Sequence, residues 1–161
     1  MQAALTGHLV LSSVHANDAV RAVSRVIDLG VEPFLLASAL LGVVAQRMVR
    51  KIDPHCPVAY TPGDDELDAL GIPQGRSGAR FYKGEGCYFC SFTGYHGRTG
   101  LFEIVVATDE FKSLVMKSAG HTDLWTQAID DGMVSMREDG AHKALAGITT
   151  PLEVMRSVYT L

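Results

Sequence analysis

The order of apolar and polar positions predicts a succession of short elements in the first part of the chain. Residues 8–15 (HLVLSSVH) are β-rich, which indicates a mostly buried strand that ends in a polar loop. Apolar residues then recur at helical spacing over residues 20–27, after Asn17 and Asp18, either of which can cap a helix. Gly30 follows the last apolar residue and ends this predicted helix.

The middle of the chain has core-type segments on either side of a different kind of sequence. Residues 33–45 begin with a proline and are apolar on nearly every face, so we expect a helix buried within a larger body. A strand is predicted over residues 47–52. Prolines and glycines interrupt residues 53–80, where we expect an insertion with one short helix at residues 64–70. A core-type strand pattern resumes over residues 97–106.

The rest of the chain predicts helices whose first turns can be recognised. Thr108 can cap a helix that ends near Gly120, and Thr122 can cap another that ends near Gly132. Two further starts have the capping-box pattern, in which a Ser or Thr and a glutamate three residues later bind each other's backbone N–H groups. These starts are Ser135 with Glu138 and Thr150 with Glu153, the second with a proline at the favoured first helical position.

Composition limits the classes of protein that the chain can represent. Its 161 residues suit one domain, or one domain with a small insertion. Hydrophobic residues make up 47% and charged residues 20%, which is typical of a globular protein rather than a disordered one. The net charge is −4 and the pI is near 5.8, so the basic surface that a nucleic-acid partner requires is not expected.

Nothing in the sequence predicts a membrane span or a targeting segment. The longest apolar run, residues 33–45, is shorter than the roughly 20 residues that a membrane-spanning helix needs. The first ten residues (MQAALTGHLV) lack a basic leader and a signal-type cleavage site. We therefore expect a cytoplasmic protein.

Three cysteines and one aspartate have the spacing of a metal site. Cys87 and Cys90 form one close pair, and Asp53 precedes Cys56 at the same spacing. Zinc prefers four ligands of this kind, which usually arrive as two close pairs from two loops. His55 is an alternative fourth ligand. A closed four-ligand site leaves no position for water, so we expect a structural role that holds a small insertion together.

Two other interpretations of the cysteines stay open at this point. They can be three buried or free thiols with no metal. Alternatively, Cys87 and Cys90 can form a redox pair, although no strand–helix context of the thioredoxin kind surrounds them. The odd number of cysteines suits a reducing compartment better than a disulfide framework.

The candidate catalytic residues do not form a complete active site. His8 and His15 flank the predicted first strand, but histidine on a strand is more often a satisfied core residue than a base or ligand. No Gly-x-x-x-x-Gly-Lys-Ser/Thr run is present to bind nucleotide phosphates. The glycine-rich stretch at residues 94–100 lacks both the lysine and the spacing.

Several blocks, taken together and in order, resemble the motor ATPases of type II secretion and type IV pilus assembly. The blocks are Leu5–Asp18, Arg25–Phe34, Ser38–Arg50, Asp53–Cys56, Gly86–Cys90, Thr93–Glu103, Met136–Gly140 and Gly147–Met155. The first block resembles the histidine box of that family. The cysteine-containing insertion is similar to that of the assembly and secretion motors, whereas the related retraction motors lack it.

The resemblance implies an α/β fold and a particular place in a larger protein. In the family, the C-terminal half is a RecA-like domain that binds ATP and Mg²⁺ between the subunits of a hexamer. Hydrolysis drives polymerisation of pilin-like subunits through an inner-membrane platform protein. The family's phosphate-binding loop and its acidic magnesium motif (Walker A and Walker B) precede the histidine box, and both are missing here. We therefore expect a C-terminal part that cannot hydrolyse ATP alone.

The resemblance also implies a division of the chain and roles for individual residues. Residues 1–52 correspond to the remaining ATPase core, residues 53–92 to a zinc-binding insertion, and residues 93–161 to core strands and a C-terminal helical subdomain. His8 and His15 match the histidine box near the terminal phosphate of the nucleotide, and Arg98 matches an arginine beside the adenine pocket. Asp53, Cys56, Cys87 and Cys90 match a four-cysteine zinc site whose first ligand has changed from cysteine to aspartate.

The parent protein is thus expected to be a cytoplasmic homo-hexamer, bound to the inner membrane through the platform protein and other components of the machine. The alternative is a stand-alone, zinc-stabilised interaction module without motor activity. If strands have lost their sheet neighbours in this chain, exposed edges favour self-association or strand exchange.

Overall fold

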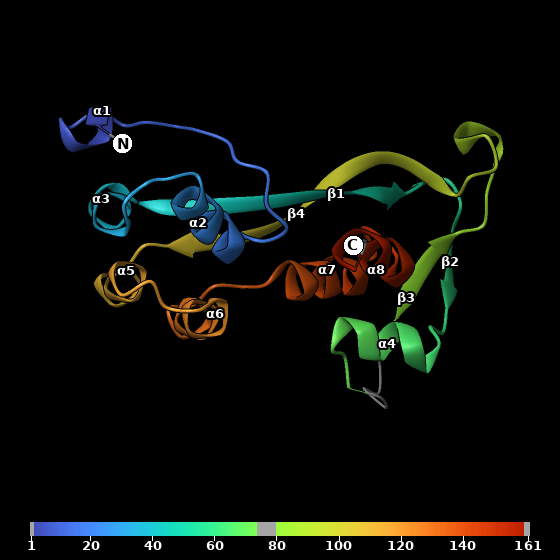
Figure 1. Cartoon of the computed structure of the whole chain (residues 1–161). Helices are drawn as coiled ribbons and strands as arrows, with labels where there is room; N and C mark the ends of the chain where they lie inside the picture. The colour runs from blue at the N-terminus through green and yellow to red at the C-terminus, as the bar shows by residue number, and fades with distance from the viewer. Residues whose placement is uncertain (1, 74–79, 160–161) are drawn as a thin grey trace. The chain divides into compact units, whose positions relative to one another are not determined.

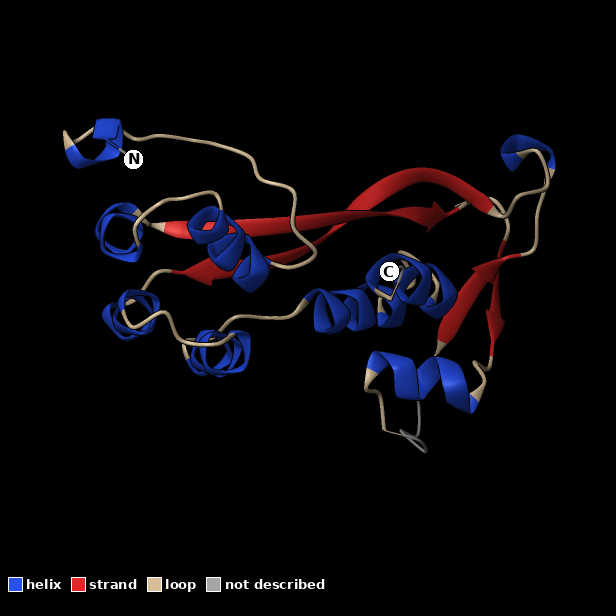
Figure 2. Ribbon diagram, viewed as in Figure 1, coloured by secondary structure: helices blue, strands red, loops and turns tan. Residues whose placement is uncertain are grey.

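The computed structural model describes residues 2–73 and 80–159 and is a mixed α/β structure (Figure 2). The chain divides into two compact units, each built from two separate stretches of sequence. Unit 1 comprises Met1–Ala45 and Glu103–Val134, and unit 2 comprises Gln46–Phe102 and Ser135–Leu161. No helix among the described residues is long and apolar enough to cross a membrane.

Two long strands form the larger of the two sheets in the described part of the chain. Strand β1 (Gly42–Ile52) pairs with β4 (Tyr95–Val106) in a two-stranded sheet. Their arrows point in opposite directions (Figure 1). A Cβ atom at Gly42 would stand 2.7 Å from the carbonyl oxygen of Val105, so the first residue of β1 has to be a glycine for β4 to approach this closely.

Unit 1 is mainly helical. Its helices are α1 (Gln2–Leu5), α2 (Ala19–Asp28), α3 (Pro33–Ala39), α5 (Asp109–Met116) and α6 (His121–Asp130). Helix α2 confirms the sequence prediction, because the carboxylate of Asp18 caps it by accepting the N–H of Arg21 at 2.6 Å. Gly30, with a φ of +92°, lies just beyond the end of the helix.

The core of unit 1 collects apolar side chains from these helices and from the end of β4. Its buried members are Ala19, Val20, Val23, Leu36, Ala37, Val105, Phe111, Val115, Leu124, Ala128 and Met133. Thr108 caps α5 by accepting the N–H of Phe111, and its hydroxyl donates to Asp131 at the end of α6. The ring of Trp125 stacks on His121, with ring centroids 5.7 Å apart.

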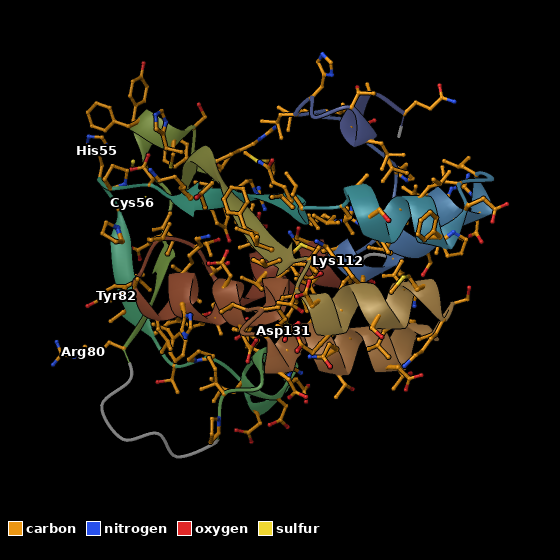
Figure 3. The ribbon with its side chains drawn as sticks, turned by 90° about the vertical axis from the view of Figure 1, so that its left-hand side faces the viewer. His55, Cys56, Arg80, Tyr82, Lys112 and Asp131 are labelled. Carbon is orange, nitrogen blue, oxygen red and sulfur yellow. The ribbon has the colours of Figure 1, made fainter. Side chains whose placement is uncertain are left out.

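Unit 2 combines a small β-ribbon with three helices and a short 3-10 turn. Its additional elements are β2 (Pro57–Tyr60), α4 (Asp64–Leu70), β3 (Phe81–Gly84), η1 (Tyr88–Cys90), α7 (Met136–Leu145) and α8 (Pro151–Val158). Strands β2 and β3 are antiparallel, with Pro57 opposite Gly84 and Tyr60 opposite Phe81. His55 and Cys56 lie at one end of this ribbon and Arg80 at the other (Figure 3).

Helices α7 and α8 pack closely because Gly140 has no side chain. A Cβ atom at Gly140 would stand 2.3 Å from Cγ1 of the buried Val154. Ser135 and Glu138 form the predicted capping box at the start of α7. Thr150 caps α8 as predicted, but the carboxylate of Glu153 accepts instead from the backbone and guanidinium of Arg50.

The predicted strand at residues 8–15 is wrong, because this segment contains neither helix nor strand. A strand needs a neighbour to pair its backbone N–H and C=O groups, and the apolar alternation alone does not supply one. Leu9 and Leu11 are 74% and 89% exposed, so the expectation that residues 8–15 are mostly buried is also wrong.

The predicted helix at residues 33–45 is right at its start and wrong at its end. Helix α3 stops at Ala39, and Leu40 already has extended backbone angles. The β-branched Val43 and Val44 favour a strand, and β1 begins at Gly42, five residues before the predicted Arg47. The β2–β3 ribbon lies within the predicted insertion but was not expected.

Candidate metal centre

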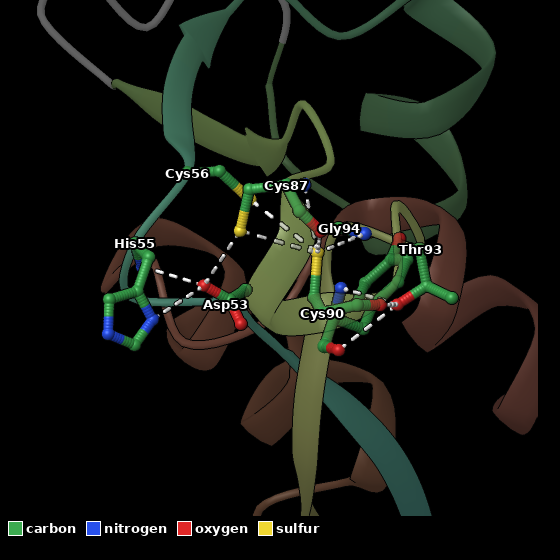
Figure 4. A network of polar contacts seen from close by, with 8 residues as sticks. Asp53, His55, Cys56, Cys87, Cys90, Thr93 and Gly94 are labelled. Carbon is green, nitrogen blue, oxygen red and sulfur yellow. Dashed lines mark hydrogen bonds and ion pairs between the residues drawn. The ribbon is translucent and has the colours of Figure 1, made fainter.

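Three thiols from two separate segments come together in unit 2. Cys56 precedes β2, whereas Cys87 and Cys90 lie on the knuckle, a name used here for residues 86–94 around η1. The Sγ atom of Cys90 lies 3.7 Å from that of Cys87 and 4.0 Å from that of Cys56 (Figure 4). All three sulfur atoms lie within 4.8 Å of one another, so one ion can contact all of them.

The knuckle folds this way because its backbone turns sharply at left-handed residues. Gly86 and Gly94 have φ angles of +98° and +76°, which glycine adopts without strain. Phe92 has a φ of +61° and donates its N–H to the carbonyl of Cys87 at 2.8 Å. A Cβ atom at Gly86 would stand 2.9 Å from the carbonyl oxygen of Phe92, so the tight turn also requires glycine on steric grounds.

Backbone donors stabilise negative charge on the most buried sulfur. The Sγ atom of Cys90 accepts the N–H groups of Cys87 at 3.1 Å and Gly94 at 3.2 Å. Burial raises the pKa of the Cys90 thiol, but these donors and the neighbouring thiols outweigh it and lower that pKa to about 7. The thiolate is the form that binds metals, so the geometry prepares Cys90 as a ligand.

Cys56 has the opposite electrostatic environment. Burial raises the pKa of its thiol, and the thiols of Cys87 and Cys90 raise that pKa further. A backbone hydrogen bond from Gly86 lowers the pKa but does not outweigh these effects. Three thiols at this distance cannot all be ionised without a compensating positive charge. A divalent cation supplies that charge, so the chemistry of the donor set fits a metal ion.

Asp53 supplies a further reason to place a cation here. Its side chain is fully buried, and its Oδ1 atom lies 4.0 Å from the Sγ of Cys87. The other oxygen, Oδ2, is buried without a hydrogen-bond partner among the described residues. A buried carboxylate oxygen without a partner is costly, and a bound cation removes that cost. The three thiols therefore fit a metal ion, and the Asp53 carboxylate lies beside one of them, Cys87.

His55 touches the same carboxylate. Its backbone N–H donates to Asp53 Oδ1 at 2.7 Å, and its ring Nδ1 lies 3.1 Å from that oxygen. The imidazole stacks on Phe89 of the knuckle, with ring centroids 4.5 Å apart. His55 was predicted only as an alternative fourth ligand, and its pairing with Asp53 was not expected. The signal was present, because an Asp side chain commonly binds the backbone N–H two residues later.

The remaining candidate residues are not members of the three-thiol group found among the described residues. His8 and His15 are exposed residues of the segment before α2 in unit 1, and the Nδ1 of His8 lies 3.1 Å from the Thr6 hydroxyl. Arg98 is an exposed residue of β4 in unit 2. The group of three thiols does not include any of them.

Comparison with known proteins identifies the family. The family model described as "Type II/IV secretion system protein" matches residues 1–156. The chain belongs to the type II/IV secretion system protein family. This confirms the resemblance on which the sequence-based expectations of function were built.

Named relatives of this secretion family cover almost the whole chain. The type IV pilus assembly ATPase PilB of Thermus thermophilus is 44% identical over 155 residues, which are 96% of this chain and 17% of that protein. The type II secretion system proteins E and HxcR of Pseudomonas aeruginosa are 42% and 46% identical over 156 residues each. The chain spans 31% and 29% of their lengths, so it corresponds to less than a third of each of these three relatives.

Proposed function

We propose that this chain is the C-terminal part of a hexameric motor ATPase that powers type II protein secretion or type IV pilus assembly. The family match over residues 1–156 is the observation that carries this proposal. The names of the relatives support it, since they include a pilus assembly ATPase and secretion system proteins. The fold of the parent domain is RecA-like in this proposal, and the 161 residues alone do not hydrolyse ATP.

In the parent protein, His8 and His15 act near the terminal phosphate of a nucleotide held by upstream residues. Their exposure in unit 1 supports this role, because both rings are accessible to a ligand. Arg98 lies beside the adenine base. ATP and Mg²⁺ are therefore ligands of the whole protein, and these three residues belong to the part of its site that this chain supplies.

The second part of the proposal is a structural zinc centre formed by Asp53, Cys56, Cys87 and Cys90. When bound, the ion would supply positive charge and four-way cross-linking between the start of β2 and the knuckle. The cluster of three thiols is the strongest support, together with the buried Asp53, whose Oδ1 lies 4.0 Å from the Sγ of Cys87. The buried apolar side chains described between Asp53 and Cys90 are few, namely Leu70, Ile72 and Phe81, so the metal stabilises a region too small to fold independently.

The partners follow from the motor role. The parent assembles as a homo-hexamer on the cytoplasmic side of the inner membrane, where it contacts the platform protein and other cytoplasmic components of the machine. The absence of a spanning helix among the described residues is compatible with attachment through partners. Nucleic acid is not a ligand.

A chimaera tests the motor function. This chain is joined to the upstream portion of the Pseudomonas aeruginosa type II secretion system protein E, in place of the homologous region. The chimaera is expected to hydrolyse ATP, whereas the 161-residue chain alone is inactive. The matched variant is the same chimaera carrying His8→Ala and His15→Ala. It is expected to fold, because both residues are exposed, but to lose most of the ATP hydrolysis.

Two results would contradict the motor proposal. Hydrolysis by the isolated chain would show that it is a complete enzyme. A folded, hexameric chimaera without hydrolysis would favour the alternative of a stand-alone, zinc-stabilised interaction module, which needs no upstream ATPase core.

A further inference from the structure

The knuckle presents three aromatic side chains to the outside of unit 2. Tyr88, Phe89 and Phe92 are 85%, 70% and 75% exposed, although they lie within five residues of one another. Apolar side chains exposed singly need no explanation, whereas several in one tight turn mark a contact surface. Residues 86–94 (GCYFCSFTG) contain no Asp, Glu, Lys or Arg. The turn therefore offers an aromatic surface without charge.

The backbone at Phe92 indicates that its ring is not there for the sake of the turn. Ser91 and Phe92 have φ angles of +51° and +61°, in the left-handed region. Glycine and asparagine suit this region, whereas a bulky aromatic residue is strained in it. Because the Phe92 ring is also mostly exposed, it adds little to the packing of unit 2. A contact outside the chain explains such a residue better than the fold does.

We propose that the knuckle inserts Tyr88, Phe89 and Phe92 into the headgroup region of an anionic lipid membrane. This inference goes beyond the proposed function, in which the parent protein reaches the inner membrane only through its partners. Three aromatic side chains exposed to this degree offer roughly 350–600 Å². Each partner in a stable protein–protein interface contributes about 800 Å², so the patch is small for a protein partner or a second copy. Aromatic residues are enriched at membrane–water interfaces, where no complementary shape is required.

The backbone of the knuckle suits a medium that contains little water. The N–H groups of Phe92 and Thr93 donate to the carbonyls of Cys87 and Cys90, at 2.8 Å and 3.1 Å. The Thr93 hydroxyl also donates to the carbonyl of Cys90, and the N–H of Gly94 donates to the Cys90 sulfur. Unpaired backbone groups are costly where water is scarce, and these groups are paired inside the turn itself.

The charges of unit 2 favour approach of this end to an anionic surface. The knuckle lies at the Cys56 end of the β2–β3 ribbon, and helix α4 lies at the other end (Figure 1). The flanking residues 51–57 and 83–96 contain the exposed Lys51 and Lys83, with Glu85 as their exposed carboxylate. Basic residues near a membrane are attracted to anionic lipids. The first turn of α4, at the far end, is acidic and contains Asp64, Asp65 and Glu66.

A double variant removes aromatic surface while keeping the turn. It combines Tyr88→Ser with Phe92→Asn, because asparagine tolerates the left-handed backbone and keeps the N–H that donates to Cys87. Phe89 is retained, since its ring stacks on His55. Phe34→Ser is the matched control, because Phe34 is a 66% exposed aromatic residue of α3 in unit 1. Thermal unfolding of each variant is expected to match that of the natural chain.

Binding is measured by co-sedimentation with vesicles of phosphatidylethanolamine and phosphatidylglycerol. The natural chain and Phe34→Ser are expected to bind equally, and the double variant about tenfold more weakly or less, since each lost ring removes apolar area from the lipid contact. Tyr88→Ser alone should give a smaller loss. On a monolayer of the same lipids, the natural chain should raise the surface pressure, which adsorption without insertion does not do.

Three results would overturn the proposal. If the natural chain stays in the supernatant at every lipid concentration, the aromatic surface is left for a protein partner. Equal vesicle binding by the natural chain and the double variant would place the lipid contact elsewhere. A loss in Phe34→Ser as large as in the double variant would indicate adhesion through any exposed apolar residue.

Discussion

The backbones of Gly84 and Gly94 lie in direct contact. A Cβ atom at Gly84, the last residue of β3, would stand 1.9 Å from the carbonyl oxygen of Gly94, the last residue of the knuckle. A Cβ atom at Gly94 would likewise stand 2.5 Å from the carbonyl oxygen of Gly84. The N–H of Gly94 donates to Cys90 Sγ, so this contact joins the ribbon to the thiol group.

Gly84→Ala is therefore expected to destabilise unit 2 by about 3 kcal/mol, at the upper end of the range for overpacking, because backbone atoms cannot move aside as a flexible side chain can. Urea denaturation measures the change. Gly63→Ala is the control, since a Cβ there meets nothing within 4 Å and its φ of −68° is ordinary. Equal effects of the two substitutions would contradict the contact.

Removal of the proposed zinc ion is expected to lower the stability of the chain. If free zinc exceeds its dissociation constant by about 100–1,000-fold, binding to the folded state contributes about 3–4 kcal/mol, and a strong chelator removes that contribution. The thermal midpoint should fall on chelation and recover when zinc is added back. Cys90→Ser, which removes one ligand, should leave a midpoint that no longer responds to chelator. A natural chain whose midpoint is insensitive to chelator would argue against a structural metal.

The ion pair between Arg50 and Glu153 predicts a specific response to acid. Hydrogen bonding from Arg50 lowers the pKa of the Glu153 carboxyl despite its burial. The carboxylate therefore stabilises the fold above its unfolded-state pKa of about 4.3, and that contribution is lost as the pH falls through the lower folded-state pKa. Glu153→Gln should be about 1–3 kcal/mol less stable at neutral pH, and should lose less stability on acidification.

Arg156 provides the control for this prediction. It lies 3.6 Å from the same carboxylate, but its side chain is 63% exposed. Arg156→Ala should therefore leave most of the acid dependence in place, since exposed ion pairs contribute little. Urea midpoints measured from about pH 6 to pH 3 cover the relevant window. Parallel pH profiles for the natural chain and Glu153→Gln would assign the acid response to other groups.

In unit 1, the buried Glu103 of β4 accepts the N–H of Ala19 at the start of α2, at 2.8 Å. Glu103→Ala removes this acceptor and is expected to lower the free energy of unfolding by about 1–3 kcal/mol. Glu103→Gln keeps an acceptor oxygen and should retain more stability. Glu32→Ala is a suitable control, because Glu32 is exposed and its side chain does not cap α3. A Glu32→Ala loss as large as that of Glu103→Ala would contradict this assignment.

The exposed apolar residues before α2 predict self-association of the 161-residue chain. Leu9 and Leu11 expose most of their side chains, and apolar surface of this kind favours contact between copies. The double substitution Leu9→Asp and Leu11→Asp should lower the average mass in light scattering at high protein concentration. Lys112→Asp on α5 alters charge without removing apolar surface and is the control. A natural chain that stays monomeric across a wide concentration range would contradict the prediction.

Local chemistry explains why most helices could be predicted from sequence. Asp18, Ser135 and Thr150 each bind an N–H within three residues, so the information for these starts is contained in a few adjacent positions. The spacing of Cys56, Cys87 and Cys90 likewise predicted that three thiols would meet, because metal ligands commonly come in close pairs.

The errors arose where structure depends on distant partners. The segment at residues 8–15 has the composition of a strand, but pairing requires another strand at the right place. The run at residues 33–45 has no clear periodicity, so the change from helix to strand near Gly42 was visible only in its β-branched residues. The unequal environments of the two Asp53 oxygens depend on three-dimensional contacts and could not be derived from spacing.

Trp125, which stacks on His121, and the tyrosines fall in different units, so each unit has its own optical signal. The chain has one tryptophan, and it belongs to unit 1, whereas the five tyrosines, Tyr60, Tyr82, Tyr88, Tyr95 and Tyr159, all belong to unit 2. Fluorescence excited where tyrosine does not absorb therefore reports on the surroundings of one unit alone. Tyrosine difference absorbance reports on the other, so a single unlabelled sample can reveal whether the two units melt together or in sequence.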